Sequence, residues 1–315
     1  MTTNYLITGG NGFIGQWVIK ELIRLKDVKI RVLCRSKPKN TIINFSDKKI
    51  EIINADITKN LYNYFNDVDY VIHLAGYVAF RERDAKKLYE INVQGTKNVL
   101  EASFKNNVKK VLNVGSSAMI GGSFDEKERD ETKVDSKIGV KPYAKSKHEA
   151  YKILSEYKNK MHISSVYPGI VFGPGDLTNT IKYFKIARYA VFYPSGGGSV
   201  IDVRDTAKGI LLVLKKGKND EGYTLTSENK SYKEILEIIC DTIKCRKPLF
   251  KIPKFLNILS IIVGKIGFSR ELYENIFAYR YYSNKKIKSL GWKPDYDFKE
   301  TISDAYKFYN KNDLI

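Results

Sequence analysis

The sequence predicts an α/β fold in which a doubly wound parallel sheet is followed by a smaller C-terminal region. Apolar strands alternate with amphipathic helices over the first 170 residues, and several strands are continuous Val, Ile and Leu runs. Such runs are typical of strands that are buried on both faces. After Gly173-Pro-Gly175 the pattern changes to short strands, loops and helices. We therefore expect residues 1–172 to form the first unit, with part of 200–218 returning to it, and residues 173–315 to form mainly the second.

The strands of the first unit can be placed in chain order. Helical segments separate them, notably at 84–106 and 143–157. This βαβα order predicts parallel strands with right-handed crossovers. With 315 residues, 43% of them hydrophobic and 28% charged, the chain is long enough to bury a full core. The expected strands are residues 5–8, 30–34, 50–54, 70–74, 111–114 and 163–167.

The turn after the first strand predicts a dinucleotide site of the Rossmann type. Gly10, Gly12 and Gly15 satisfy a G-x-G-x-x-G pattern, and Gly9, Gly12 and Gly15 satisfy G-x-x-G-x-x-G. Glycine allows a tight turn, close approach of the backbone to a pyrophosphate, and close packing of helix on strand. The amide groups at the start of the next helix, aided by the helix dipole, would face the phosphates.

The end of the second strand indicates which dinucleotide binds. Arg35 with Ser36 and Lys37 stands where an acidic residue would bind the ribose 2′-hydroxyl of NAD. Arginine at this point instead favours the 2′-phosphate of NADP. We therefore expect NADP(H) as the preferred cofactor, with NAD(H) as a possible one.

The third and fourth strands also end in residues suited to a ligand. Because ligands of open α/β sheets collect at the carboxyl ends of the strands, these residues are candidate cofactor contacts. They are Asp56 and Ile57 after the third strand, and Leu74, Ala75 and Gly76 after the fourth.

The net charge of +19 admits a nucleic-acid partner, an acidic membrane surface or an anionic ligand. The lysines are dispersed along the chain, and no zinc finger, basic-region helix or RNP-type motif accompanies them. Steering of a polyanionic dinucleotide is the simpler explanation, and we expect no nucleic-acid partner.

A tyrosine and a lysine are the candidate catalytic pair. Tyr143 and Lys147 stand at i and i+4, hence on one face of a helix. The ammonium is expected to lower the pKa of the phenol, making it a usable acid or base. Ser116 and Ser117 follow an earlier strand, where one hydroxyl would polarise a carbonyl oxygen.

Cysteine count and hydropathy indicate a reducing compartment and no membrane insertion. Cys34, Cys240 and Cys245 are too few and too oddly spaced for a disulfide framework or a zinc site, so we expect no metal. No secretory signal opens the sequence, and a cytoplasmic location is the expectation. The apolar run 255–266 is interrupted and shorter than the about 20 residues that span a bilayer. We expect a buried helix or a cover over a substrate there.

Taken together, these residues resemble the extended short-chain dehydrogenases/reductases of the NAD-dependent epimerase/dehydratase family, over nearly the whole chain. The motifs are specific for the superfamily and much less so for a substrate. Besides the glycine turn they comprise residues 56–58, 73–75, 92–96, 116–117, 143–147, 168–175, 203–205 and 290–294.

The resemblance implies a role for each motif. Tyr143 would be the proton donor or acceptor, and Lys147 would bind the nicotinamide ribose and tune the phenol. Ser117, or Ser116 in its place, would hold the substrate oxygen. Asn92 would lie beside the cofactor. Further implied cofactor contacts are Gly9, Gly12, Phe13, Ile14, Gly15, Pro168 and Val171.

Within the family, the chain looks more like the dihydroflavonol-reductase and 3β-hydroxysteroid-dehydrogenase branch. The loop at 167–170 lacks the Asn that is usual near a substrate diphosphate, and the second strand lacks its acidic residue. Residues 281–286 also resemble that branch. The segment 252–266 and the tyrosines at 279, 281 and 282 would line a pocket, unless they are core residues.

Three hypotheses follow. The first is an NADP-dependent oxidoreductase that transfers a hydride between nicotinamide and a carbonyl or alcohol, with tyrosine as acid or base. The second is a nucleotide-sugar epimerase or dehydratase with tightly bound NAD. The third is a non-catalytic regulator that senses the dinucleotide. The partner is a small-molecule substrate, and a homodimer is possible.

Overall fold

The computed structural model describes residues 2–36, 41–79, 81–134, 142–252 and 277–315. Its centre is a seven-stranded sheet with the order β10-β6-β5-β4-β1-β2-β3, in which every neighbouring pair is parallel. This is a doubly wound sheet, so the predicted fold class is confirmed. The strands are β1 (Thr3–Thr8), β2 (Val28–Cys34), β3 (Ile50–Asn54), β4 (Tyr70–His73), β5 (Lys110–Val114), β6 (Ile163–Pro168) and β10 (Glu221–Leu225).

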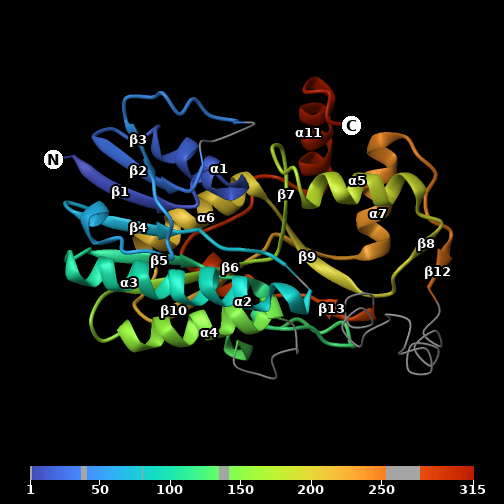
Figure 1. Cartoon of the computed structure of the whole chain (residues 1–315). Helices are drawn as coiled ribbons and strands as arrows, with labels where there is room; N and C mark the ends of the chain where they lie inside the picture. The colour runs from blue at the N-terminus through green and yellow to red at the C-terminus, as the bar shows by residue number, and fades with distance from the viewer. Residues whose placement is uncertain (1, 37–40, 80, 135–141, 253–276) are drawn as a thin grey trace.

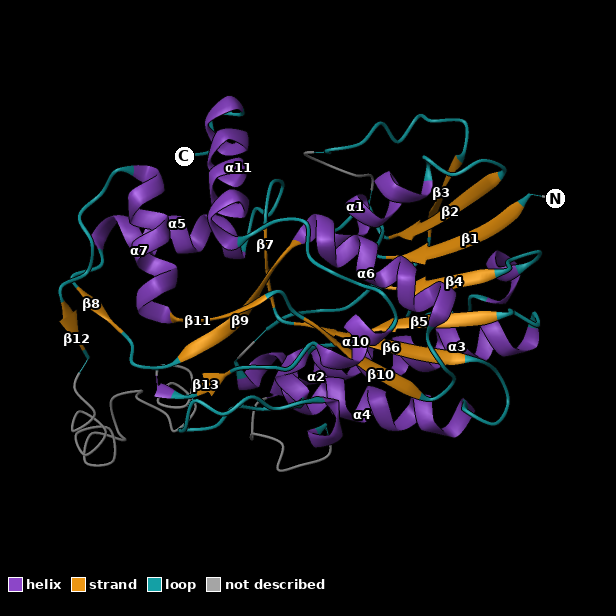
Figure 2. Ribbon diagram, turned by 180° about the vertical axis from the view of Figure 1, so that it is seen from behind, coloured by secondary structure: helices purple, strands orange, loops and turns teal. Residues whose placement is uncertain are grey.

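Helices cover both faces of this sheet (Figures 1 and 2). On one face, α1 (Phe13–Leu22) and α6 (Val203–Lys216) pack on a shared core. On the opposite face, α4 (Pro142–Tyr157) and α3 (Gly95–Lys105) pack on a second core. Because adjacent strand residues point to opposite faces, Leu6 and Ile7 are both fully buried, one in each core. This double burial explains the continuous apolar runs in the sequence.

The helix expected at 84–106 is helical but irregular. It begins as α2 (Ala85–Leu88), passes through a π-helical turn (Tyr89–Gln94), and continues as α3 (Gly95–Lys105). The wider turn buries the consecutive side chains of Ile91, Asn92 and Val93. Such π-turns are rare and are frequent at functional sites.

The rest of the described chain forms a second region beside the sheet (Figure 2). A smaller sheet contains β7 (Ile170–Phe172), β9 (Gly197–Asp202), β11 (Glu228–Ser231) and β13 (Tyr279–Arg280), and β8 (Phe192–Tyr193) pairs with β12 (Phe250–Lys251). The helices α5 (Asn179–Tyr189), α7 (Tyr232–Ile243) and α11 (Phe298–Lys311) share an apolar core, and α10 (Lys285–Ser289) is short. Short 3-10 turns are Tyr62–Phe65, Glu82–Asp84, Ser117–Met119 and Glu131–Lys133.

The second region returns to the first sheet through α6 and β10, which add a covering helix and an edge strand. The division of the chain at residue 172 stays a prediction. The segment 255–266 lies outside the described residues. Among the helices of the described part, none is long and apolar enough to cross a bilayer.

Two sequence motifs that are far apart in the chain meet on the face of the sheet that α6 covers. Asp205, fully buried on α6, accepts hydrogen bonds from the amide groups of Asp295 and Tyr296. The indole Nε1 of Trp292 donates to the carbonyl oxygen of Asp205 at 3.3 Å. The motifs at 203–205 and 290–294 therefore form one joint between α6 and the C-terminal segment.

Candidate active site

The turn between β1 and α1 has no room for a side chain at Gly9 or Gly15. Gly9 has a φ of +70°, and a Cβ there would lie 2.8 Å from the backbone of Ala75. A Cβ at Gly15 would lie 2.5 Å from the carbonyl oxygen of Gly9. No side-chain cap bonds the start of α1 at Gly12, which leaves the amide groups of its first turn to an anion. This turn fits the pyrophosphate of a dinucleotide.

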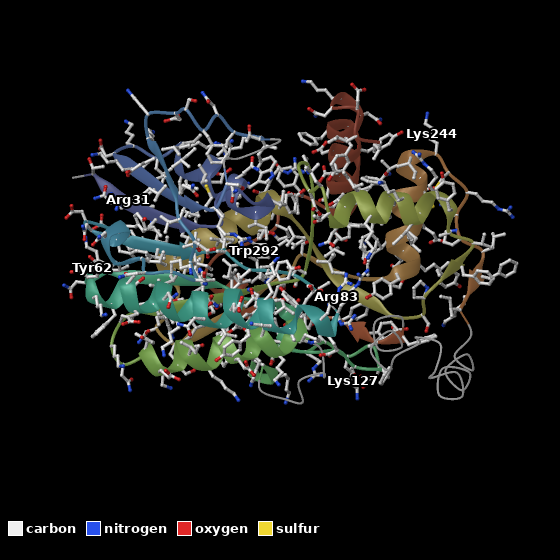
Figure 3. All side chains as sticks on the ribbon, in the orientation of Figure 1. Arg31, Tyr62, Arg83, Lys127, Lys244 and Trp292 are labelled. Atoms are coloured by element: carbon white, nitrogen blue, oxygen red, sulfur yellow. The ribbon has the colours of Figure 1, made fainter. Side chains whose placement is uncertain are left out.

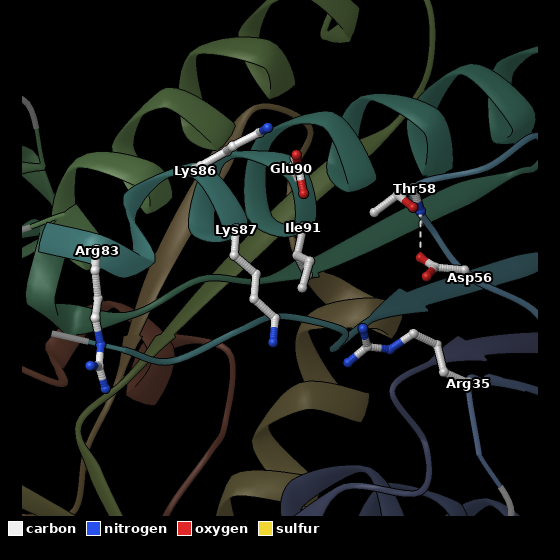
Figure 4. Close-up of a pocket in the computed structure, with 8 residues that line it drawn as sticks. All are labelled: Arg35, Asp56, Thr58, Arg83, Lys86, Lys87, Glu90 and Ile91. Atoms are coloured by element: carbon white, nitrogen blue, oxygen red, sulfur yellow. Dashed lines mark hydrogen bonds between the residues drawn. The ribbon is translucent and has the colours of Figure 1, made fainter. Parts of the chain in front are cut away.

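A cavity of about 460 Å³ lies beyond the ends of β2 and β3. Figure 4 shows Arg35 and Lys87 extending towards each other across it, whereas Lys86 points away. Its charged lining comprises four cations against two carboxylates, which are Arg35, Arg83, Lys86 and Lys87 against Asp56 and Glu90. The excess of positive charge suits a phosphate group.

Asp56 is held ionised at the edge of this cavity. Burial alone would raise the pKa of its carboxyl group, but hydrogen bonds from Thr58 and the charge of Arg35 lower the pKa overall. The Thr58 amide donates to the carboxylate at 2.9 Å, as Figure 4 shows. The neighbouring Ile57 points the other way, into the core beneath α3.

A buried histidine fixes the end of β4. The Thr96 hydroxyl donates to the Asn92 carbonyl oxygen at 2.6 Å, so its oxygen accepts from His73 Nε2 at 2.9 Å. Nδ1 then accepts from the Thr8 hydroxyl at 2.7 Å, and the Ala75 amide donates to the same hydroxyl oxygen. We assign the Nε2–H tautomer from this network. Burial, with the charge of Lys147, lowers the pKa of His73 to about 3.

The π-helical turn directs Asn92 towards the helix that bears the candidate catalytic residues. Its oxygen accepts from the Tyr77 amide at 2.7 Å, and its nitrogen donates to the Tyr77 carbonyl oxygen and to the Ser146 hydroxyl. Ser146 donates in turn to the Tyr143 carbonyl oxygen at 2.8 Å. Asn92 thereby ties the loop after β4 to the first turn of α4.

Tyr143 and Lys147 both face the loops at the ends of β4 and β5. The Lys147 ammonium lies 3.5 Å from the Val114 carbonyl oxygen, and a Cβ at Gly76 would lie 3.3 Å from that ammonium. Burial raises the pKa of the Tyr143 phenol, a shift opposed by a hydrogen bond with Ser116. Burial also lowers the pKa of Lys147 to about 8.

The direction of the Tyr143 shift differs from the sequence-based expectation, in which Lys147 lowers the pKa of the phenol. The reason is geometric: Lys147 is aimed at the backbone of Val114 and Gly76, and desolvation of the phenol dominates. At neutral pH the phenol therefore carries its proton.

The two serines have different neighbours. The Ser116 hydroxyl bonds the Tyr143 phenol, whereas Ser117 is buried and bonds the phenol of Tyr282. Tyr282 is a buried residue that donates to the Gly121 carbonyl oxygen at 3.1 Å, and burial raises its pKa to about 12. Of the two serines, Ser116 is therefore the one in contact with the phenol of Tyr143, and the choice between them as the hydroxyl that holds the substrate oxygen stays a prediction.

The predicted site residues fall into three groups. Those at the glycine turn and at the ends of β2, β3, β4 and β5 share one edge of the sheet, together with Asn92, Tyr143 and Lys147. Pro168 ends β6, and Val171 on β7 is buried in the core under α1 and α6. Phe13 and Ile14 open α1 and pack on that core as well.

Sequence reasoning missed several residues that build the site. His73 and Thr96 stood in motifs that were noted, but their contact with Thr8 joins three separate segments. Ser146 and Lys87 stand in predicted helices. Spacing alone does not show that Ser146 bonds Asn92 or that Lys87 lines the cavity. Of the proposed pocket tyrosines, Tyr282 is buried and the rings of Tyr279 and Tyr281 contact each other.

Comparisons with known proteins identify the family of this chain. The model of the NAD dependent epimerase/dehydratase family matches residues 5–225. A putative dihydroflavonol 4-reductase of Synechocystis is 25% identical, covering 100% of this chain and 97% of the relative. A putative UDP-glucose 4-epimerase of Methanocaldococcus jannaschii is 29% identical and covers 98% of each chain.

The solved structures are similar over the same length. The dTDP-glucose 4,6-dehydratase DesIV of Streptomyces venezuelae, solved with NAD bound, has a TM-score of 0.80 at 20% identity, with 98% of each chain covered. This likeness concerns the fold. With the matched family model, the parallel sheet and the glycine turn, the chain belongs to the NAD-dependent epimerase/dehydratase family, with the fold of the extended short-chain dehydrogenases/reductases.

Proposed function

We propose that this protein is an NADP-dependent oxidoreductase that interconverts a carbonyl compound and its alcohol. The observation that supports it most is the arrangement of Tyr143, Ser116 and Lys147 at the strand edge that also holds the glycine turn. A bound nicotinamide would supply or accept the hydride. The protein's own residues provide the proton and the orientation.

In the reduction direction, the Tyr143 phenol donates its proton to the substrate oxygen as the carbonyl carbon is reduced. Ser116 donates a hydrogen bond to that oxygen and fixes its place beside the phenol. The raised pKa of Tyr143 keeps the phenol protonated at neutral pH, as this direction requires. Lys147 binds the ribose of the cofactor through its ammonium group.

The preference for NADP is supported by the cavity beyond β2. Arg35 follows the strand where an acidic residue would select NAD, and Lys87 faces it from α2. Two cations on opposite walls would hold the 2′-phosphate of NADP between them, with Asp56 beside the adenine.

Substitution of Tyr143 by Phe tests the reaction. The hydroxyl is lost while the ring is kept, so turnover of a carbonyl substrate should fall by at least about 100-fold while NADPH still binds. Tyr157→Phe, on the same helix but partly exposed and at its far end, is the matched control. Unchanged turnover of the Tyr143→Phe variant would refute the proposed proton donor.

Substitution of Arg35 by Asp tests the cofactor. The reversed charge should weaken NADPH binding and shift preference towards NADH by about tenfold or more. Lys48→Asp makes the same change of charge at an exposed lysine that does not line the cavity. Equal effects of the two substitutions on selectivity would show that only the net charge matters.

A second candidate is a nucleotide-sugar epimerase or dehydratase that retains NAD. The 29% identity to a putative UDP-glucose 4-epimerase over 98% of each chain favours it. The two candidates differ in what the purified protein contains. Stoichiometric NAD released on denaturation would favour the epimerase or dehydratase, and an empty protein that binds NADPH more tightly than NADH would favour the reductase.

A further inference from the structure

An exposed apolar surface lies at the end of the molecule where β8 and β12 pair, away from the seven-stranded sheet (Figure 1). Its large apolar side chains are between 44 and 79% exposed. We call this set the end patch, and it consists of Ile186, Tyr189, Val191, Phe192, Leu249 and Phe250.

The end patch is built from two segments of the chain, which meet where β8 pairs with β12. Phe192 and Phe250 are register partners of the two strands, and their ring centroids are 5.8 Å apart. The Leu249 amide donates to the Val191 carbonyl oxygen at 2.9 Å. Ile186 and Tyr189 are three residues apart on the exposed face of α5, which leads directly into β8.

Positive charge predominates in the two segments that carry the end patch. Residues 179–193 contain no Asp or Glu, and in 241–252 Asp241 is the one acidic residue, paired with Lys247 at 2.8 Å. Figure 3 shows Lys244 at this end of the molecule. The exposed cations in the two segments are Lys182, Lys185, Arg188, Lys244, Arg246, Lys247 and Lys251.

We propose that the end patch docks this protein onto the surface of an anionic phospholipid bilayer. The aliphatic and aromatic side chains would enter the boundary between headgroups and acyl chains, with the Tyr189 hydroxyl at the wet side. The cations of the two segments would attract the anionic headgroups. The chain lies on the bilayer through this patch and does not cross it.

Charge and shape favour a bilayer over other occupants. A second copy of the chain would bring the same cations against one another, which opposes association. A nucleic acid would pair with the cations and could stack bases on the three aromatic rings, but it would leave Ile186, Val191 and Leu249 exposed to water. A mixture of aromatic and aliphatic side chains together with lysine and arginine fits the bilayer interface.

The test is co-sedimentation of the purified full-length protein with vesicles. We expect binding to equimolar phosphatidylglycerol and phosphatidylcholine, weakening with salt, and little binding to phosphatidylcholine alone. The variant K185E/R188E/R246E should bind the anionic vesicles at least about tenfold more weakly. The variant Y189S/F192S/F250S should lose binding at high salt, where the apolar contribution remains. Thermal unfolding of each variant checks that the fold is kept.

The matched control is the variant K26E/K29E/K48E, which reverses the charge of three exposed lysines near β2 and β3, far from the end patch. It changes the net charge by the same amount. If this control lost as much binding as K185E/R188E/R246E, the effect would be one of net charge and the proposed location would be wrong. Failure of the wild-type protein to bind anionic vesicles overturns the proposal. So does loss of a dimer in Y189S/F192S/F250S with vesicle binding unchanged, because the patch would then join two copies. None of these results depends on the reaction at Tyr143.

Discussion

At the scale of single residues, His73 shows how a buried titratable group can hold a loop in place without taking part in chemistry. Its two nitrogens are committed to Thr8 and Thr96. A second proton would set Nδ1–H against the Thr8 hydroxyl proton and place a charge in the core beside Lys147. Both consequences agree with the pKa of about 3.

This pKa predicts acid sensitivity. Between the unfolded value of 6.5 and about 3, the unfolded chain binds a proton that the folded protein does not. Stability is therefore complete above pH 6.5 and falls with acidification, by up to about 1.4 kcal/mol per pH unit. Urea unfolding at a series of pH values should show this slope in the wild type.

The His73→Gln variant should have a shallower slope, whatever its stability at neutral pH. His162, which is partly exposed, supplies the comparison, and His162→Gln should keep most of the steep dependence. Equal slopes in the wild type and His73→Gln would show that other groups cause the acid sensitivity.

Lys147 predicts a pH dependence of the reaction. Its pKa is lowered to about 8, so the ammonium is present below that pH and is lost above it. The rate of carbonyl reduction, measured as kcat/KM, should therefore decline as pH rises through about 8. Lys147→Arg keeps the charge at high pH and should remove this limb even if its maximal rate is lower. If kcat/KM of the Lys147→Arg variant still declined above about pH 8, the decline would belong to another titrating group.

At the scale of elements, the π-helical turn and α4 act as a unit because Asn92 and Ser146 join them. The extra residue per turn rotates Asn92 inward, where its amide bonds both the loop after β4 and the helix of Tyr143. The position of the candidate proton donor is thus set partly by a segment some fifty residues earlier in the chain.

Removal of the Ser146 hydroxyl tests this link. Ser146→Ala should cost about 1–2 kcal/mol of stability, because a buried hydrogen-bond partner is lost. It should also lower kcat more than it changes KM, since the start of α4 loses a constraint. Ser155→Ala, farther along α4 and partly exposed, should change both by much less. A loss of stability with kcat unchanged would limit Ser146 to a structural role.

At the scale of the whole molecule, Asp205 joins α6 to the C-terminal segment. Its carboxylate accepts two backbone amide hydrogen bonds while fully buried, so the side chain is costly to replace. Asp205→Asn places an amide hydrogen against those donors and should lower the free energy of unfolding by about 2–3 kcal/mol. Asp295→Asn, which removes a partly exposed ion pair with Lys208, should cost less than about 1 kcal/mol. Similar costs in denaturant unfolding would contradict this ranking.

The strands and the glycine turn could be predicted because their signals are local. Strand β3 matches its predicted bounds, and β4 and β6 differ by one residue at one end. The contacts that complete the site are not local: Ser146 meets Asn92 across 54 residues, and His73 meets Thr8 across 65. The resemblance pointed to Ser117, with Ser116 as the alternative, but the sequence could not show that Ser116 contacts Tyr143 and Ser117 contacts Tyr282.

The place of α6 and β10 in the sheet has a consequence for synthesis on the ribosome. Strand β6 ends at residue 168, but the helix that covers one face begins at 203 and the last strand ends at 225. At roughly 5–20 residues per second, several seconds separate these events. During that interval the nascent sheet presents an open apolar face and the unpaired edge of β6. A chain released before residue 203 would keep both exposed, and would need a chaperone to stay out of aggregates.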